Sequence, residues 1–316
     1  MTHETLELTA GVPGRRLDLA ILDRLGDRLS RAQLQALIRD GMVSVDGRPR
    51  KPGERLRGGE RITLRLPRPQ ASGGVQAEAI PLSLAYEDAH LALVDKPAGM
   101  VVHPGDHDER GTLVAAALTR WPEIAFMPGD ARRAGIVHRL DKDTSGLIIV
   151  ARQDAARRAL MQQFQQRSVE KRYLALLERR PAADSGRIDA PLGRDPRQRK
   201  RMAVVRQGRA AISDYRVLKT FPSGHTLVEV RPLTGRTHQI RVHMLRLGCP
   251  VVGDPVYGLR RQRLPLARQF LHAAGLAFTH PVSGARLSFA SALPAQLQVI
   301  LDMLAVSADP AGTRVT

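Results

Sequence analysis

Asp141 and Asp143 place two carboxylates close together in a polar segment, with cationic side chains beside them. A carboxylate held in a pocket can act in catalysis as a nucleophile or as a general base. The alternative is an ordinary turn, in which aspartates accept hydrogen bonds from nearby backbone amides. The apolar run at 147–150 follows a Thr-Ser-Gly turn, so we expect a buried strand directly after the carboxylates. Such a strand would supply the rigid base that a catalytic group requires.

A longer stretch around these carboxylates resembles a known signature. The residues at 138–147, His-Arg-Leu-Asp-Lys-Asp-Thr-Ser-Gly-Leu, are similar to the signature loop of the RluA family of pseudouridine synthases. Asp-Lys-Pro-Ala-Gly at 95–99 and Val-His-Pro-Gly at 102–105 also match, and the resemblance covers about residues 15–289. It is most similar to the RluD subgroup, which modifies large-subunit ribosomal RNA. The resemblance implies an α+β chain with a central mixed, mainly antiparallel sheet flanked by helices, plus a small N-terminal α/β RNA-binding module.

The resemblance also implies roles for individual residues. Asp141 is expected to be the essential carboxylate, acting either as a nucleophile on the sugar or as the base that starts elimination through a glycal. Tyr173 is expected to stack on the target base, and its phenol could also lie near the C5 proton of that base. Arg241, in a Thr-His-Gln-Ile-Arg segment, is expected to pair with the aspartate, and Arg236 is the rival partner. Arg139 is expected either to fill the space that a flipped-out base leaves or to contact a phosphate.

The charge of the chain points to a polyanionic partner. The formal net charge is +18 and the pI is near 11.3, and nucleic acid is the commonest partner of so basic a protein. Converting uridine to pseudouridine changes no redox state, so we expect no cofactor and no metal. We expect the partner to be large-subunit ribosomal RNA or a pre-ribosomal particle, and the protein to be a monomer that does not bind membranes.

The location of the protein is predicted from what the sequence lacks. The first ten residues carry two glutamates and no apolar core of a signal peptide, and no later stretch is apolar over the length of a membrane span. Cys249 is the single cysteine, so neither an internal disulfide nor a thiolate metal site is expected. These features favour the cytoplasm.

Residues 1–67 are expected to form a small basic module. Apolar residues recur at helical spacing twice, and then Val43 and Val45 alternate with polar residues before an Asp46-Gly47 hairpin turn. The pattern resembles an RNA-binding module first seen in a small-subunit ribosomal protein. The candidate phosphate contacts in this module are Arg31, Arg39, Arg48, Arg50 and Lys51.

A linker is expected at 68–79, where Pro, Gly, Ser and Gln mix without periodicity, followed by a catalytic domain at 80–316. The segment 184–207 is rich in Gly, Pro and Arg and is expected to be a surface segment with a phosphate-binding loop. Its candidate phosphate contacts are Arg199, Lys200 and Arg201. A helix is expected to open at Thr237 and to end at Gly248. Further strands are expected at 91–94, 171–177, 226–231 and 286–289, and further helices at 112–120, at 154–166 and after residue 294.

Two other functions agree with parts of the sequence. A metal-dependent hydrolase would use some of His138, Asp141, Asp143, His238 and His243, but the histidines lack the spacing of His-Glu-x-x-His metal sites. An RNA-binding ribosome assembly factor without catalysis would explain the charge and the small module. It would not explain the Asp141 loop together with Tyr173 and Arg241.

Overall fold

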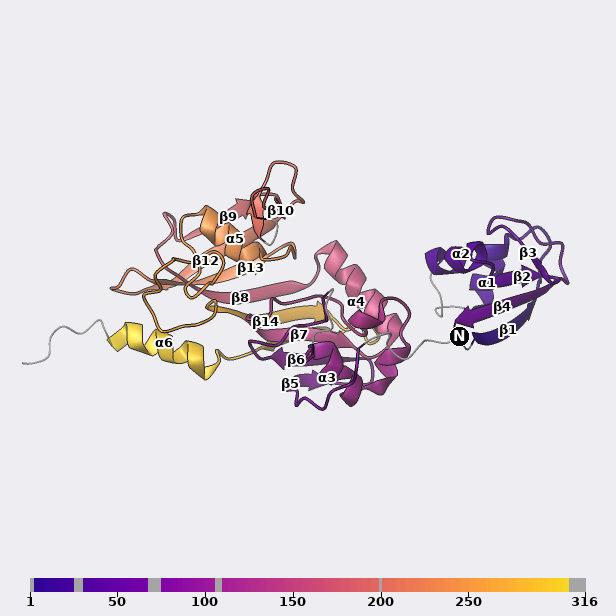
Figure 1. The fold of residues 1–316 in the computed structure, drawn as a ribbon, viewed down its shortest axis with the longest axis horizontal. Coiled ribbons are helices and arrows are strands. Elements are labelled where there is room, and N and C mark those ends of the chain that lie inside the picture. Colours follow the sequence, from indigo (N-terminus) through magenta and orange to yellow (C-terminus); the bar gives the residue numbers. More distant parts are fainter. Residues whose placement is uncertain (1–2, 26–30, 68–74, 106–109, 199–200, 307–316) are drawn as a thin grey trace, which may run out of the picture. The chain divides into compact units, whose positions relative to one another are not determined.

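The computed structural model describes residues 3–25, 31–67, 75–105, 110–198 and 201–306. The chain divides into two compact units, one formed by Met1–Gly73 with Ala125–Ala131 and the other by Gly74–Ile124 with Arg132–Thr316 (Figure 1). Of the linker expected at 68–79, residues 75–79 belong to the larger unit. Val75 is buried there, and the Glu78 carboxylate accepts a hydrogen bond from the Gly111 amide.

The smaller unit is a four-stranded antiparallel sheet with two helices, and its strand order is β1-β4-β2-β3. Its apolar core includes Leu17 and Ile21 from the first helix and Leu34 from the second. Asp46 and Gly47 both have positive φ, which the tight turn between two such strands requires, so the expected hairpin is confirmed. The elements are β1 (His3–Thr9), α1 (Leu17–Leu25), α2 (Arg31–Arg39), β2 (Val43–Val45), β3 (Arg48–Pro49) and β4 (Arg61–Pro67).

The larger unit is built on a nine-stranded sheet of order β5-β6-β7-β14-β8-β13-β12-β9, with β15 paired to β14 (Figure 1). Only the β7–β14 pair is parallel among these pairs, so the expected mixed, mainly antiparallel sheet is confirmed. The strands are β5 (Leu84–Glu87), β6 (Leu91–Lys96), β7 (Ser145–Ala151), β8 (Glu170–Leu177), β9 (Ser185–Asp189), β12 (Ile212–Thr220), β13 (Thr226–Pro232), β14 (Leu271–Thr279) and β15 (Arg286–Ala290), with a separate pair β10 (Leu192–Arg194) and β11 (Met202–Val204).

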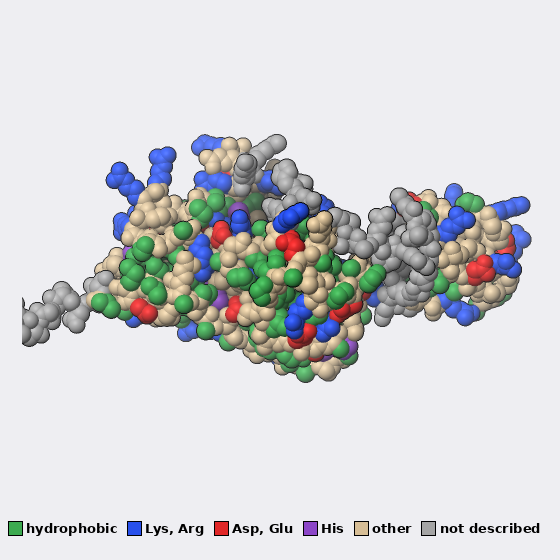
Figure 2. Space-filling view, turned by 60° about the horizontal axis from the view of Figure 1, so that its bottom comes forward, with side chains coloured by type: hydrophobic (Ala, Val, Ile, Leu, Met, Phe, Trp, Pro, Cys, Tyr) green, Lys and Arg blue, Asp and Glu red, His purple; other side chains and the backbone are tan. Residues whose placement is uncertain are grey.

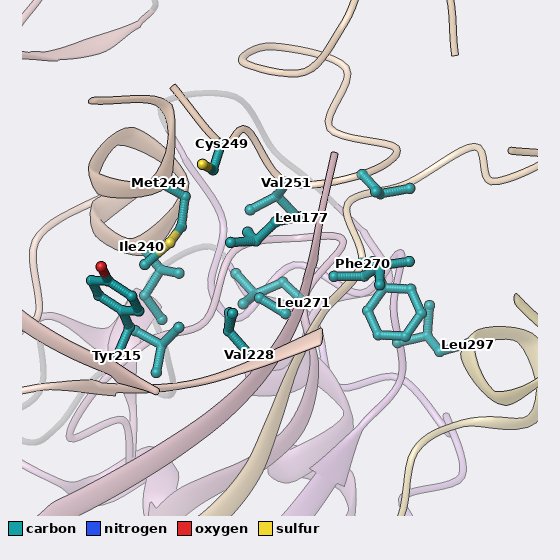
Figure 3. Packing of buried hydrophobic residues seen from close by; sticks show 14 of the residues in the cluster. Leu177, Tyr215, Val228, Ile240, Met244, Cys249, Val251, Phe270, Leu271 and Leu297 are labelled. Carbon is teal, nitrogen blue, oxygen red and sulfur yellow. The ribbon is translucent and has the colours of Figure 1, made fainter. Parts of the chain in front are cut away.

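Helices pack on this sheet through apolar side chains. Leu160 of α4 packs in one cluster with Leu147 and Ile149 of β7. Ile240 and Met244 of α5 lie in a second cluster with Val228 of β13, as the close view in Figure 3 shows. The α-helices are α3 (Leu113–Arg120), α4 (Asp154–Gln166), α5 (Gln239–Arg246) and α6 (Ala295–Val306), and short 3-10 turns lie at Pro122–Phe126 and Ala131–Arg133. Within the described part of the chain, we find no helix with the length and apolar character needed to cross a bilayer.

Two expectations from the sequence were wrong in detail. The segment 184–207, expected to be a surface loop, contains the strands β9, β10 and β11. The helix expected to open at Thr237 begins at Gln239, and its N-cap is His238 in the left-handed conformation, without a side-chain cap. The Gln239 amide oxygen instead accepts a hydrogen bond from the Arg236 N–H, which stabilises the start of the helix. The expected end is confirmed, since Gly248 has φ +74° just after the helix.

Gly146 permits the parallel contact between β7 and β14 that joins the two halves of the larger sheet. It has φ +112°, and it pairs with Ala273 of β14. A Cβ atom at this position would lie 2.3 Å from the Ala273 carbonyl oxygen and 2.7 Å from the Ala273 nitrogen. Both neighbours are backbone atoms of a central strand, so neither can move without breaking the strand pairing.

We therefore expect Gly146→Ala to destabilise the larger unit by about 3 kcal/mol or more, because it combines a positive φ with a backbone clash. Gly248→Ala is the matched control, since Gly248 also has a positive φ but has open space around its missing Cβ. Gly248→Ala should lower the free energy of unfolding by only about 1 kcal/mol. Thermal unfolding of both variants measures the difference, and equal losses would show that the close approach to Ala273 is unimportant.

Candidate active site

Asp141 lies in the loop that leads directly into β7. Its carbonyl oxygen accepts a hydrogen bond from the Thr144 N–H at 3.1 Å, which closes a turn. The segment before β14 holds the same loop from the other side. Arg268 donates to the Asp143 carbonyl at 3.1 Å, and Gln269 donates to the Thr144 hydroxyl at 3.3 Å. The loop is therefore tied to two neighbouring strands of the sheet.

Lys96, at the end of β6, supports this loop from inside the protein. Its side chain is completely buried, and its ammonium donates to the carbonyl oxygens of Pro97, Met100 and Lys142 at 2.8, 2.9 and 3.0 Å. Burial lowers the pKa of Lys96 to about 8, although the carboxylates of the 141–143 loop oppose this change. All three donors are used, so the ammonium links the 95–100 turn to the backbone of the Asp141 loop.

Arg241, in α5, lies between two carboxylates. Its Nη1 is 3.0 Å from Asp141 Oδ2, and its Nε and Nη2 are 2.6 and 2.8 Å from the two oxygens of Asp254. Only 5% of the Arg241 side chain and none of the Asp254 side chain is exposed, compared with 17% of the Asp141 side chain. Burial would lower the pKa of Arg241, but the bonds to Asp254 and Asp141 outweigh this and raise it above its ordinary value. The guanidinium therefore stays charged and orients Asp141.

A tyrosine packs beneath this array. The ring of Tyr257 lies 5.0 Å from the Arg241 guanidinium carbon and 5.0 Å from that of Arg201. Its hydroxyl accepts a hydrogen bond from the Met202 N–H at 2.8 Å and is 2.9 Å from His238 Nδ1. Tyr257 therefore fixes the side of Arg241 that does not face a carboxylate.

The loop before α5 is held by Gln239. Its side-chain oxygen accepts hydrogen bonds from the Thr234 hydroxyl and the Arg236 N–H, and its amide donates to Ile212 and Ser213 of β12. This anchors the first turn of the helix that carries Arg241. The Arg236 side chain donates to the Ala210 carbonyl, so Arg241, and not the rival Arg236, contacts Asp141.

Tyr173 of β8 and His138 lie in the same cavity as Asp141. Burial raises the pKa of Tyr173 above its ordinary range, and the charge of Asp141 adds to this effect. Burial lowers the pKa of His138 to about 3, and its Nε2 is 3.0 Å from the Ile149 N–H. Its ring also stacks on Phe164 at 4.6 Å. Both residues are therefore uncharged at neutral pH, and the imidazole carries its proton on Nδ1.

The cavity has a volume of about 500 Å³, within the usual range for small-molecule sites. Its walls come from the Asp141 loop, the end of α4, the start of β8 and the segment 232–241. The three residues expected to be catalytic, Asp141, Tyr173 and Arg241, all line it. It therefore brings together a carboxylate, an aromatic ring and a charged guanidinium from three separate parts of the chain.

The residues expected to contact RNA are found in different settings. Arg139 is exposed and lines the cavity. Arg201 packs on Tyr257, as described above. Arg39, Arg48, Arg50 and Lys51 are exposed in the smaller unit, and Arg50 pairs with Glu54. On the face in Figure 2, Lys and Arg side chains protrude from both units. The side chain of Arg31 and the whole of Arg199 and Lys200 lie outside the described residues.

The residues considered for a metal site do not converge. His243 points to Ser213 and to the Ala190 carbonyl, with its two ring nitrogens 2.9 and 3.1 Å from them. His138 Nε2 is occupied by the Ile149 N–H. Across the residues that the structure describes, no group of three His, Cys, Asp or Glu side chains is arranged to hold an ion.

Sequence reasoning missed Asp254 and Tyr257, which hold Arg241. A weak signal for them exists, because Gly253-Asp254-Pro255-Val256-Tyr257 places a carboxylate after a glycine at the end of an apolar run. Gly253 has φ +72°, and a Cβ atom there would lie 2.1 Å from the Arg268 carbonyl oxygen. Only glycine fits this position, and that requirement becomes visible only with the fold in hand.

Comparison with known proteins gives a consistent result. A family model described as RNA pseudouridylate synthase matches residues 90–246, and an S4 domain model matches residues 15–62. A Chloroflexus aurantiacus protein described as an uncharacterized RNA pseudouridine synthase is 53% identical over 92% of this chain and 90% of its own length. A Nitrosomonas europaea protein named ribosomal large subunit pseudouridine synthase D is 45% identical over 96% of this chain and 88% of its own.

Solved structures agree with the sequence relatives. Human RNA pseudouridylate synthase domain containing 1 superposes with a TM-score of 0.57 at 28% identity, covering 74% of this chain and 97% of that chain. The resemblance inferred from the loop at 138–147 and the RNA-binding module inferred at the N-terminus are both confirmed. The chain therefore belongs to the RNA pseudouridylate synthase family, and its relatives include proteins named ribosomal large subunit pseudouridine synthase D.

Proposed function

We propose that this chain converts specific uridines of large-subunit ribosomal RNA to pseudouridine, with Asp141 as the catalytic carboxylate. The observation that carries the proposal is the pairing of Asp141 with Arg241 inside a cavity that Tyr173 also lines. Support for the RNA substrate comes from the S4 domain match and from relatives named for the large ribosomal subunit. The net charge of +18 fits the same partner.

The reaction breaks the bond between N1 of uracil and C1′ of ribose, turns the base, and forms a bond between C5 and C1′. The proton on C5 is lost and N1 gains one, so the product is an isomer. Asp141 can take part in two ways. It can attack C1′ and form a covalent sugar intermediate, or it can remove a sugar proton and start elimination to a glycal. In both routes Arg241 holds the carboxylate at the sugar-base junction.

Tyr173 is suited to hold the base and is a poor choice for removing the C5 proton. Its raised pKa keeps the phenol protonated at neutral pH, and a general base must be deprotonated to accept a proton. The ring can still stack on uracil while the freed base turns. The task of Tyr173 is therefore to retain and orient the base beside Asp141.

A uridine in structured RNA must leave its stack to reach Asp141. Arg139 is exposed and lines the cavity two residues before the catalytic carboxylate, so it is placed to occupy the vacated space or to contact a phosphate. The exposed cations of the smaller unit add contacts that depend on charge and not on base identity. Binding and chemistry are thereby assigned to different groups of residues.

We expect Asp141→Asn to reduce pseudouridine formation by about 10⁴-fold or more, because an amide can neither attack C1′ nor remove a proton. RNA affinity should stay within a few-fold. Asp143→Asn is the matched control, since it removes a carboxylate two residues away and should retain most activity. Single-turnover pseudouridine formation at saturating enzyme is the measurement. Substantial turnover by Asp141→Asn would refute its role, and a wild-type chain that binds RNA without turnover would favour the assembly factor considered above.

We further expect the triple variant Arg39→Ala, Arg48→Ala, Lys51→Ala to weaken RNA binding without slowing the saturated single-turnover rate. The slope of log affinity against log salt should flatten by nearly three units, because each of the three lost phosphate contacts contributes about 0.9. Replacing Arg39 and Arg48 by lysine keeps the charge and should keep the slope. An unchanged slope in the triple variant would show that this face of the module does not bind RNA.

A further inference from the structure

The cavity that holds Asp141 also contains a group of cations that take no part in the proposed chemistry of Asp141, Arg241 and Tyr173. Lys171, Arg167 and Arg236 all line it, from the start of β8, the end of α4 and the loop before α5. The Lys171 ammonium contacts the Thr234 carbonyl at 3.3 Å, and Arg236 donates to the Ala210 carbonyl. Within the described residues, none of the three is paired with a carboxylate.

Arg167 is close enough to Lys171 and to Arg236 to affect both of them. Burial lowers the pKa of Lys171 to about 8, and the positive charge of Arg167 adds to the effect. Burial likewise lowers the pKa of Arg236, with Arg209 and Arg167 contributing. Holding a partly buried ammonium beside a guanidinium with one carbonyl partner costs free energy unless an anion joins them. Elsewhere in the unit, the partly buried Arg157 has a carboxylate partner in Asp154.

The three cations lie close to the place proposed for the target nucleotide. Lys171 and Tyr173 are two residues apart on β8, so their side chains lie on the same face of the strand, about 7 Å apart along it. A base stacked on Tyr173 would therefore place its own or a neighbouring phosphate within reach of the Lys171 ammonium. Arg167 is exposed, so the cluster is open to a strand entering from solvent.

We propose that Lys171, Arg167 and Arg236 form a phosphate subsite that binds one phosphodiester of the RNA next to the target uridine. This proposal rests on the proposed function, since it takes the target base to lie between Asp141 and Tyr173. The ligand chemistry is a phosphate monoanion, which the guanidinium groups and the ammonium bind together. The subsite would hold the flipped nucleotide by its backbone while the freed base turns.

Scanning an RNA substrate with single methylphosphonates tests the proposal, because each one removes the charge of one phosphate. The RNA is a stem-loop of large-subunit ribosomal RNA around a uridine that the wild-type protein modifies. At one position beside this uridine, neutralisation should weaken wild-type binding by about tenfold. Lys171→Met should bind the unmodified RNA more weakly than the wild type does. Neutralising the same phosphate should then weaken RNA binding by Lys171→Met no further. If each methylphosphonate weakened RNA binding equally in the wild type and in Lys171→Met, the proposal would be overturned.

Three controls keep this result interpretable. Arg246→Ala removes an exposed cation of α5 that lies outside the cavity lining, and it should show the full wild-type cost at the sensitive position. Arg167→Ala changes an exposed residue and should reproduce the Lys171→Met result if the buried variant folds poorly. Inorganic phosphate should compete with RNA for the wild type more strongly than for Lys171→Met. Competition without a position-specific phosphodiester effect would mean a free-anion site and would also overturn the proposal. A wild-type protein that forms no pseudouridine would instead refute the proposed function.

Discussion

The site depends on the ion pairs that the buried Arg241 guanidinium forms with Asp254 and Asp141. The guanidinium binds Asp254 through two hydrogen bonds and reaches Asp141 with a third nitrogen. Burying a charge is costly unless it is fully paired, and a cation shared by two carboxylates in this geometry meets that condition. Because Asp254 is completely buried and Asp141 is partly exposed, the inner carboxylate fixes Arg241 and the outer one is presented to the cavity.

Much of the larger unit serves to bring these charges together. Gly146 lets β7 and β14 pair in parallel, which sets the direction of the Asp141 loop. Lys96 holds the backbone of that loop through three carbonyl groups. Gln239 fixes the first turn of α5 against β12, and so it places Arg241. Each of these residues fixes the backbone or helix that carries one of the charged side chains of the site.

The residues proposed to take part in the reaction were the easiest to predict from the sequence. Asp141, Tyr173 and Arg241 lie in short segments with distinctive residue order, and the structure places all three around one cavity. Asp254 was missed because its function depends on a contact across thirteen residues of chain, which no local pattern specifies. The helix start at Gln239 was also missed, because a side chain from inside the helix satisfies the backbone there, in place of a cap at Thr237.

Some strands could be predicted from their own residues, and others could not because they depend on distant pairing partners. β7 was expected from its apolar, β-branched run, which is buried along its whole length. β9, β10 and β11 were not expected, because Gly, Pro and Arg dominate their segment and their pairing partners supply most of the order. β1 was also missed, although it pairs with β4 over its full length. Strands with weak local patterns are specified mainly by the strand beside them.

The central claim is that Asp254 acts on the reaction by fixing Arg241, which in turn holds Asp141. The direct test is the single-turnover rate of Asp254→Asn at saturating RNA, compared with Arg241→Met and with the double variant. The account predicts a loss of about tenfold or more for Asp254→Asn with RNA affinity unchanged, because a misplaced catalytic group loses rate and not binding. It also predicts that the double variant is no slower than Arg241→Met alone. A wild-type rate for a folded Asp254→Asn protein, or losses that multiply in the double variant, would contradict the claim.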